Sequence, residues 1–211
     1  MKVLAVEISS DAGSLALVED GGVVASVPMD ARQRRSQGLF DAGGALLSGA
    51  GWGWEALGAF AVGRGPGSYT GLRVSLTAAC GWALPQNKSV WTVSSGAALA
   101  AEILAEKTEM MSVVVWGDAR RGQIWAGRFE REPLHLLRQT GAWRLLPAEL
   151  RGREWPDAHW IEPGRVPQAE WVGRLFFAGG PSEERQPIYL HPPVIVPPRF
   201  DAEGRPRILG S

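Results

Sequence analysis

The sequence predicts an α/β protein of two lobes, and two observations lead to this prediction. Over the first 109 residues, short apolar runs rich in β-branched side chains alternate with segments of helical spacing, in the order β-β-β-α-β-α-β-α. Beyond residue 110, two further β-rich runs stand on either side of a glycine-containing turn. We therefore expect a first lobe at residues 1–109 and a smaller second lobe at residues 110–211.

The first lobe begins with three strands in meander and continues with alternating helices and strands. The turn that follows the second strand has the sequence Glu-Asp-Gly-Gly, which is typical of a hairpin. Pro85 ends the second helix, and Ser94 or Ser95 can cap the third. The strands are expected at residues 3–8, 13–18, 23–27, 59–63 and 90–93, and the helices within 32–51, at 70–84 and up to about 107. This order is that of one lobe of a ribonuclease H-like, actin-like fold.

The second lobe is less regular, and we expect it to be a degenerate version of the first. Strands at residues 113–116 and 123–129 enclose a turn at 118–122. Beyond residue 132 the chain is rich in proline and tryptophan, with a short apolar run at 158–161 and a helix expected at 168–178. The proline-rich end of the chain, including the stretch from Pro187 to Pro198, must be largely extended.

Composition excludes several classes of function. The 211 residues carry 22 basic and 22 acidic side chains, so the formal net charge of zero favours neither nucleic acid nor a membrane surface. One cysteine, Cys80, excludes an internal disulfide and fits a reducing cytoplasm. The apolar run between Met1 and Ser9 is too short for a signal peptide or a membrane span. We expect a cytoplasmic protein that contacts nucleic acid, if at all, through a partner.

The most specific stretch of the sequence is Gly-Arg-Gly-Pro-Gly-Ser-Tyr-Thr-Gly-Leu-Arg at residues 63–73, between a buried strand and a helix. Gly65 and Gly67 permit backbone angles that other residues avoid, and Ser68 or Thr70 can cap the helix. Free amides at such a helix start can bind an anion. The spacing matches neither the dinucleotide-binding nor the P-loop pattern, so a structural turn is favoured over an anion site.

These residues resemble the signature of the TsaB (YeaZ) family. The resemblance covers about the first 130 residues and extends to the sequence Tyr-Leu-His-Pro-Pro at residues 189–193, where the family has arginine in place of His191. The segments that carry it are residues 4–9 with the hairpin behind them, 63–73, 93–95 and 117–124.

The family resemblance implies an actin-like fold without working catalytic loops. It implies a non-catalytic scaffold or activator that dimerises with TsaD and joins the ATPase TsaE. That bacterial complex makes N6-threonylcarbamoyladenosine next to the tRNA anticodon. The resemblance also implies a homodimer when the chain is alone, and no cofactor.

Several positions depart from the family pattern. Glu7, Ile8 and Ser9 stand where Asp-Thr-Ser is usual at the end of the first strand. Arg35 replaces a common histidine, Ser75 a glycine, and Cys80 a lysine or glutamine. These changes identify a divergent member.

The residues themselves argue against catalysis. Glu7 could supply the acidic group that an actin-like phosphotransferase needs, but no second glycine-rich phosphate loop follows Ser112. The three histidines, His135, His159 and His191, are too far apart in sequence to form a metal-binding His-x-x-x-His pair, and each is interpreted as a lone surface histidine. Cys80 is interpreted as a buried packing residue. A divergent actin-like enzyme, either a nucleotide phosphotransferase or a metal hydrolase, remains an alternative, as does a self-associating protein unrelated to tRNA.

Two helices rich in small residues indicate where a partner binds. No charged residue occurs between Val74 and Asn87, and the preceding helix contains Gly38, Gly43 and Gly44. A fully buried core helix is one interpretation, and a four-helix bundle with a second molecule is the other. We favour the bundle, with Leu76 and Ala79 facing the partner. The predicted partner-binding residues are Arg35, Leu39, Phe40, Leu46, Leu47, Tyr69, Leu72, Arg73, Ser75, Leu76 and Ala79.

Overall fold

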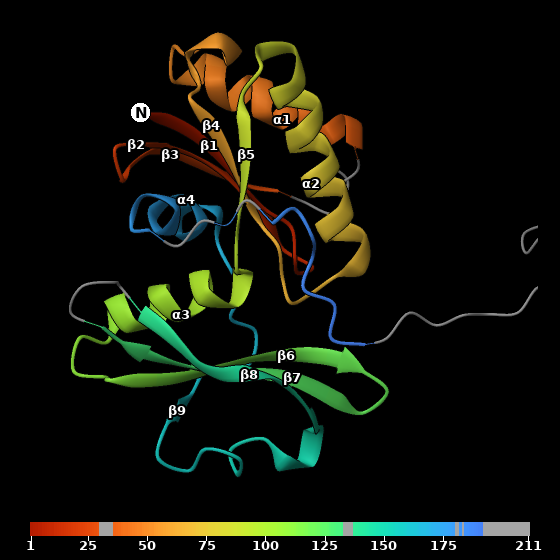
Figure 1. The fold of residues 1–211 in the computed structure, drawn as a ribbon, viewed down its shortest axis with the longest axis vertical. Helices are drawn as coiled ribbons and strands as arrows, with labels where there is room; N and C mark the ends of the chain where they lie inside the picture. The colour runs from red at the N-terminus through yellow and green to blue at the C-terminus, as the bar shows by residue number, and fades with distance from the viewer. Residues whose placement is uncertain (30–35, 133–136, 180–181, 183, 192–211) are drawn as a thin grey trace, which may run out of the picture.

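A computed structural model of the chain shows two sheets with helices packed between them (Figure 1). It describes residues 1–29, 36–132, 137–179, 182 and 184–191. The first sheet has the strand order β3-β2-β1-β4-β5 and the second has the order β8-β7-β6-β9. The predicted actin-like α/β fold with two sheets is confirmed. Among the described residues, no helix is long and apolar enough to cross a membrane.

The first sheet is built from five strands and carries helices on both faces. Its strands are β1 (Lys2–Glu7), β2 (Gly13–Glu19), β3 (Gly22–Met29), β4 (Ala59–Gly63) and β5 (Ser89–Val93). β1, β2 and β3 are antiparallel, whereas β4 runs parallel to both β1 and β5. Helices α1 (Ser36–Gly49) and α2 (Tyr69–Ala83) cover one face, and α4 (Ala169–Phe177) covers the other.

Alternation along the strands explains why both faces are covered. Leu4 and Val6 on β1 join the core beneath α1 and α2, while Val3 and Ala5 point to the opposite face. On that face Gly173 of α4 lies so close that a Cβ added there would be 2.4 Å from a methyl of Val18. The strand is apolar at every position from 3 to 6 because neither face reaches solvent.

The second sheet contains the largest element that the sequence did not predict. Strands β6 (Ser112–Arg120), β7 (Gln123–Arg131) and β9 (His159–Trp160) correspond to expected runs. β8 (Leu137–Pro147), eleven residues long, pairs antiparallel with β7 in a region where we expected only short apolar runs. Helix α3 (Ser95–Glu106) packs on one face of this sheet, and Trp116, Trp155 and Trp160 pack on the other.

The C-terminal part of the chain returns to the first sheet. Helix α4 forms where a helix was expected, but it packs on β1 and β2 of the first sheet rather than on the second. Residues 184–190 have no helix or strand, as the proline content predicts, and residues 192–198 of the predicted extended stretch lie outside the described residues. A boundary at residues 109 and 110 therefore separates the sheets but not every element packed on them.

Candidate functional site

The glycine turn between β4 and α2 is held by hydrogen bonds on both sides. Gly65 has a φ of +96°, and its amide donates to the Ser95 side-chain oxygen at 2.9 Å. The Ser68 amide donates to the carbonyl of Ser9 at 2.6 Å. A Cβ on Gly67 would lie 2.1 Å from that same carbonyl oxygen. Glycine is required at 67 because the backbone of Ser9, just beyond β1, approaches so closely.

The hydrogen bonds within this turn also bear on whether its amides are free to bind an anion. The amides of Gly65 and Ser68 already have acceptors within the protein. Ser68 is the N-cap residue of α2, and its side chain accepts from the Gly71 amide at 3.2 Å. Thr70 is exposed and lies within the helix. These bonds favour the structural turn, and an anion site at this helix start stays a prediction.

Glu7 at the end of β1 is sealed in the interior beneath the glycine turn. Its side chain has no solvent exposure, and one carboxyl oxygen accepts from the Ser9 amide at 2.6 Å. The other oxygen, Oε2, has no hydrogen-bond partner among the described residues and would lie 1.8 Å from a Cβ on Gly63. Burial raises the pKa of Glu7, against the opposing effect of hydrogen bonds from Ser9 and Ser95.

This environment does not suit a group that must reach a metal or a water molecule. Glu7 can contact neither solvent nor a ligand without movement of the turn that covers it. Among the residues that the structure describes, no group of three or more histidine, cysteine, aspartate or glutamate side chains is arranged to hold a metal ion.

The outer faces of α1 and α2 form the most distinctive surface of the first lobe. Phe40 on α1, Tyr69 at the start of α2 and Leu84 just beyond its end are 43%, 55% and 81% exposed. Between them lie small exposed residues, including Thr77 and Gly81. Hereafter the α1–α2 face means the solvent-facing side of these two helices, with Phe40, Gly44, Thr77, Gly81 and Leu84 as its reference residues.

Aromatic packing connects the two helices of this face. The Phe40 ring meets the Trp82 ring edge-on, with 5.0 Å between their centroids. The Trp54 ring also packs on Trp82, with 5.2 Å between their centroids. A Cβ on Gly43 would be 3.2 Å from Trp54, whereas one on Gly44 would meet nothing within 4 Å. The first glycine therefore makes room for tryptophan, and the second faces open space.

The predicted partner-binding residues divide into four groups. Phe40, Tyr69 and Arg73 are exposed, while Leu46 and Leu76 are half-buried. Arg35 lies outside the described residues. The others are buried and cannot be reached by a partner in this structure: Leu39, Leu47, Leu72, Ser75 and Ala79.

Ala79 and Ser75 therefore require a correction. We expected Ala79 to face the partner, but it belongs to the core between α2 and the sheet. Ser75 is fully buried, and its hydroxyl donates to the Leu72 carbonyl one turn earlier at 3.1 Å. Both residues occupy the inner side of α2, whose period of 3.6 places them away from Thr77 and Gly81.

Sequence reasoning missed a contact between Tyr189 and the start of α2. The Arg73 guanidinium lies over the Tyr69 ring at 4.0 Å, and its Nε donates to the Tyr189 hydroxyl at 2.9 Å. The Tyr69 and Tyr189 rings are 5.2 Å apart. Residues 73 and 189 are 116 positions apart, so no local pattern could predict this contact.

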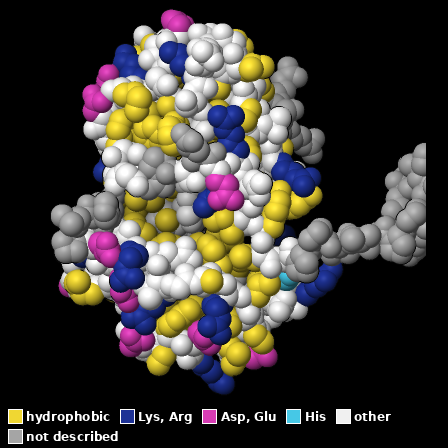
Figure 2. Space-filling view, viewed as in Figure 1, with side chains coloured by type: hydrophobic (Ala, Val, Ile, Leu, Met, Phe, Trp, Pro, Cys, Tyr) yellow, Lys and Arg dark blue, Asp and Glu magenta, His cyan; other side chains and the backbone are white. Residues whose placement is uncertain are grey.

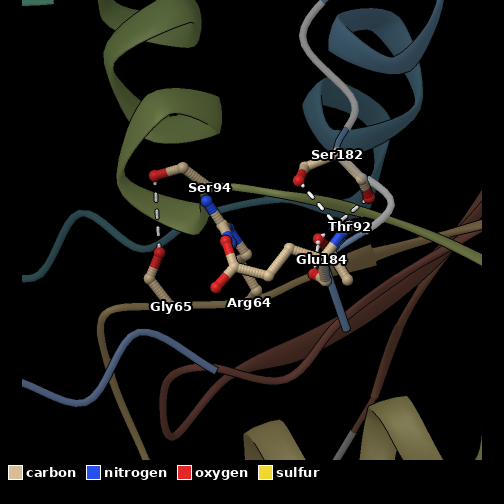
Figure 3. Close-up of polar contacts among 6 residues, drawn as sticks. All are labelled: Arg64, Gly65, Thr92, Ser94, Ser182 and Glu184. Atoms are coloured by element: carbon tan, nitrogen blue, oxygen red, sulfur yellow. Dashed lines mark hydrogen bonds and ion pairs between the residues drawn. The ribbon is translucent and has the colours of Figure 1, made fainter. Parts of the chain in front are cut away.

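The segment that brings Tyr189 to α2 is attached to the first lobe by backbone hydrogen bonds. Thr92 at the edge of the sheet exchanges two backbone bonds with Ser182, of 2.9 and 2.8 Å. Arg64 pairs with Glu184 at 2.7 Å (Figure 3). The Arg64 carbonyl also accepts from the Ile188 amide at 2.7 Å. The chain thus follows the edge of β5 and the glycine turn before it reaches α2.

The remaining candidate residues have structural contacts. Cys80 is half-buried, not fully buried as predicted, and it packs against the core beneath α2. His159 is half-buried, whereas His191 is exposed, as expected for a surface histidine. The His159 ring lies 3.5 Å from the Lys107 amine, and the His191 ring lies 2.8 Å from the Ala119 carbonyl. His135 lies outside the described residues.

A cavity of about 490 Å³ lies between α3, α4 and the turn after β2. Its walls are mainly apolar and include Leu104, Trp171 and Phe177. Arg131 also lines it, but its guanidinium donates to the carbonyls of Leu104 and Lys107 at the end of α3. This arginine therefore caps a helix and is not available to a ligand.

Three comparisons place the chain among known proteins. Residues 3–157 match the family described as "TsaD: tRNA N6-adenosine threonylcarbamoyltransferase". The "tRNA threonylcarbamoyladenosine biosynthesis protein TsaB" of Escherichia coli (strain K12) is 28% identical over 173 residues, covering 74% of each chain. The structure of "YeaZ from Pseudomonas aeruginosa" matches with a TM-score of 0.75 and 24% identity, covering 90% of this chain and 99% of that one. The last likeness shows the fold.

Proposed function

We propose a function on the premise that this chain belongs to the TsaB (YeaZ) family of tRNA threonylcarbamoyladenosine biosynthesis, within the wider TsaD family. In this proposal the chain is a non-catalytic scaffold or activator. It binds a TsaD homologue and supports that partner while the partner transfers the threonylcarbamoyl group to tRNA. It makes no chemical contribution of its own.

One observation carries the proposal: the α1–α2 face exposes large apolar side chains at its ends and small residues between them. Phe40 and Leu84 are large apolar side chains that are 43% and 81% exposed. Small residues such as Gly44 and Gly81 let a second pair of helices approach closely. A partner that covers this face would bury the apolar side chains of Phe40 and Leu84.

The burial of Glu7 supports the non-catalytic part of the proposal. A phosphotransferase of this fold needs an acidic group that reaches metal and water from the end of the first strand. Here that carboxyl group is enclosed by Gly63, Ser9 and Ser95. The raised pKa of Glu7 further disfavours the charged form that a metal would require.

Charge distribution supports indirect contact with tRNA. The net charge is zero, and on the face shown in Figure 2 basic and acidic side chains are interspersed rather than gathered by sign. A surface that binds tRNA by itself needs a basic stripe. We infer that tRNA is held mainly by the partner, that a TsaE ATPase joins the assembly, and that the chain pairs with itself when alone.

The test places a charge on the α1–α2 face of the full-length protein. Thr77 is exposed in the middle of α2, so Thr77→Glu should leave the monomer folded. Desolvating the new carboxylate in a helix bundle should weaken binding to the TsaD homologue by at least tenfold in isothermal titration calorimetry. Thr108→Glu, at an exposed threonine away from this face, is the matched control and should bind normally.

A reconstituted modification assay extends the test to function. Threonylcarbamoylation of tRNA by the TsaD homologue should fall when Thr77→Glu replaces the native chain and should be unaffected by Thr108→Glu. If Thr77→Glu bound and activated normally, the α1–α2 face would not be the interface. If the native chain alone hydrolysed ATP and lost that activity in Glu7→Gln, the scaffold role would be replaced by an enzymatic one.

A further inference from the structure

Tyr69, Arg73 and Tyr189 form a compact cluster beside the α1–α2 face, which we call the Tyr–Arg–Tyr cluster. The guanidinium plane of Arg73 lies 4.0 Å above Tyr69 and 5.8 Å from the Tyr189 ring centroid. The hydrogen bond from Arg73 Nε to the Tyr189 hydroxyl holds the guanidinium against the second tyrosine. A guanidinium held this way loses the rotamer freedom that an exposed arginine normally has.

The cluster stays on the surface although it is ordered. Tyr69 is 55% exposed and Tyr189 is 44% exposed. Among the described residues no carboxylate lies within ion-pair distance of Arg73, whereas the nearby Arg64 is paired with Glu184. The structure thus fixes the orientation of a positive group and provides no acidic partner for it from the described part of the chain.

Tyrosine and arginine are the residues most often found at the energetic centres of protein interfaces. The cluster sits at the N-terminal end of α2, on the same helix that carries Thr77 and Gly81 of the α1–α2 face. Because α2 has no other charged residue up to its end, Arg73 is the only cation that this helix offers to a bound molecule.

We propose that the Tyr–Arg–Tyr cluster anchors an acidic side chain of the protein partner at the edge of the α1–α2 face. This inference rests on the proposed function, because the partner is the protein that covers that face. A carboxylate can receive hydrogen bonds from the two terminal nitrogens of Arg73 while the rings of Tyr69 and Tyr189 shield it from water. A carboxylate is favoured over an RNA phosphate because the cluster adjoins an apolar face and not a basic field.

The C-terminal segment is part of this anchor. Tyr189 is placed by its neighbour Ile188, whose amide bonds to the Arg64 carbonyl at 2.7 Å, and by the Thr92–Ser182 pair further back. Residues 184–189 thus supply one wall of a binding site whose other walls come from α2. A chain that lacks them should keep α2 and Arg73 but lose the orientation of the guanidinium.

The experiment measures binding of full-length variants to the TsaD homologue by calorimetry at two salt concentrations. Arg73→Ala should weaken binding by at least tenfold and flatten its salt dependence, because the screened charge pair is lost. Arg73→Lys keeps the charge but not the planar stacking, and it should give a smaller loss. Tyr189→Phe keeps the ring and removes the hydroxyl, so its loss should be a few-fold, and that of Tyr189→Ala should be larger.

Arg174→Ala is the matched control. Arg174 is an exposed arginine on α4 whose guanidinium lies 5.0 Å from the Trp171 ring, on the opposite face of the sheet, and its removal should leave binding unchanged. Circular dichroism melts should confirm that every variant is folded. A charge-swapped pair, Arg73→Glu with each acidic residue of the partner helices changed in turn to arginine, should identify the carboxylate by restoring binding.

The possible outcomes separate the carboxylate anchor from the proposed function. If the native chain binds the TsaD homologue and Arg73→Ala binds equally well, the anchor is refuted and the proposed function stands. If the native chain does not bind that homologue, both fail. If Arg73→Ala leaves complex formation unchanged but reduces retention of tRNA in a gel-shift assay, Arg73 contacts RNA phosphate, and the carboxylate anchor is wrong.

Discussion

The end of β1 buries a carboxyl group, whereas the α1–α2 face exposes large apolar side chains. At the end of β1 a carboxyl group, Glu7, is fully buried with one oxygen unpartnered. On the outer side of α1 and α2, Phe40 and Leu84 are exposed to solvent. A globular protein normally places these residue types the other way round, and each reversal has an energetic penalty.

The contrast shows which part of the molecule is accessible to other molecules. The buried carboxyl contacts only its own turn, so its penalty is balanced within the chain by the bond from Ser9. The exposed apolar side chains have no such compensation in the monomer and gain it only when another surface covers them. The comparison therefore favours a molecule that binds by a helical face over one that reacts at a strand end.

The largest effect on stability should come from adding one methyl group at Gly71, where α2 contacts the backbone just beyond β1. A Cβ on Gly71 would lie 1.9 Å from the Ile8 carbonyl oxygen, a backbone atom that cannot move without shifting the end of β1. Gly71→Ala should therefore lower the free energy of unfolding by about 3 kcal/mol or more, near the upper end for overpacked positions. Chemical denaturation followed by circular dichroism measures the loss.

Gly81 provides the control on the same helix. A Cβ there would lie 3.7 Å from the Phe40 ring, an ordinary contact, so Gly81→Ala should not destabilise the monomer and should gain up to about 1 kcal/mol from helix propensity. Equal losses for the two variants would mean that the glycine turn and the end of β1 are not in tight contact, and the comparison above would lose its basis.

An intermediate effect is expected for Glu7→Gln, and it should depend on pH. Because burial raises the pKa of Glu7 in the folded state, the native protein holds this proton at pH values where the unfolded chain has released it. The stability of the native chain should therefore fall as the pH rises above about 4.5, the ordinary range of glutamate, until Glu7 ionises in the folded state. Glutamine cannot ionise and should not show this decline.

The measurement is a series of urea denaturation curves between pH 4 and pH 8. Native protein and Glu7→Gln should be closest in stability at the acid end, with the mutant more stable towards neutral pH. A stability difference that stayed constant across this range would mean that Glu7 releases its proton at the same pH in the folded and the unfolded chain, and burial would then not raise its pKa.

Sequence reasoning was most accurate where both local and periodic signals agreed. β4 was expected at residues 59–63 and forms there, and α2 begins one residue before the predicted start. Ser68 and Ser94 accept the capping bonds that mark the starts of α2 and α3. Strands β1 and β4 of this lobe are buried on both faces, so the composition changes sharply at their boundaries.

β8 was missed because its partly exposed environment weakens the apolar run and the alternation by which a strand is recognised in a sequence. Leu137–Pro147 is half-buried or exposed at nearly every position and contains Gly141 in a left-handed conformation, so neither a continuous apolar run nor clean alternation appears. The candidate site was only partly predictable for a different reason. Helical spacing located α1 and α2 but not which side of each would be buried, and the Tyr189 contact joins segments far apart in the chain.

The smallest effect on stability should come from adding one methyl group to the α1–α2 face. Gly44 lies on α1, and a Cβ there would meet nothing within 4 Å, so Gly44→Ala should stabilise the monomer by about 0.5–1 kcal/mol through helix propensity alone. If another pair of helices packs on this face, the same methyl group enters the interface and should weaken binding to the TsaD homologue several-fold. Stability and association would then change in opposite directions.

Gly43→Ala is the matched control one residue earlier. A Cβ at that position would lie 3.2 Å from Trp54 and 3.4 Å from Trp82, so this variant should lower monomer stability because the rings must shift. It faces inward, and any loss of binding should follow the loss of folded protein. A Gly44→Ala variant that was more stable and also bound normally would indicate that the partner does not approach α1 closely, and the interface would have to be centred on Thr77 and Arg73 of α2.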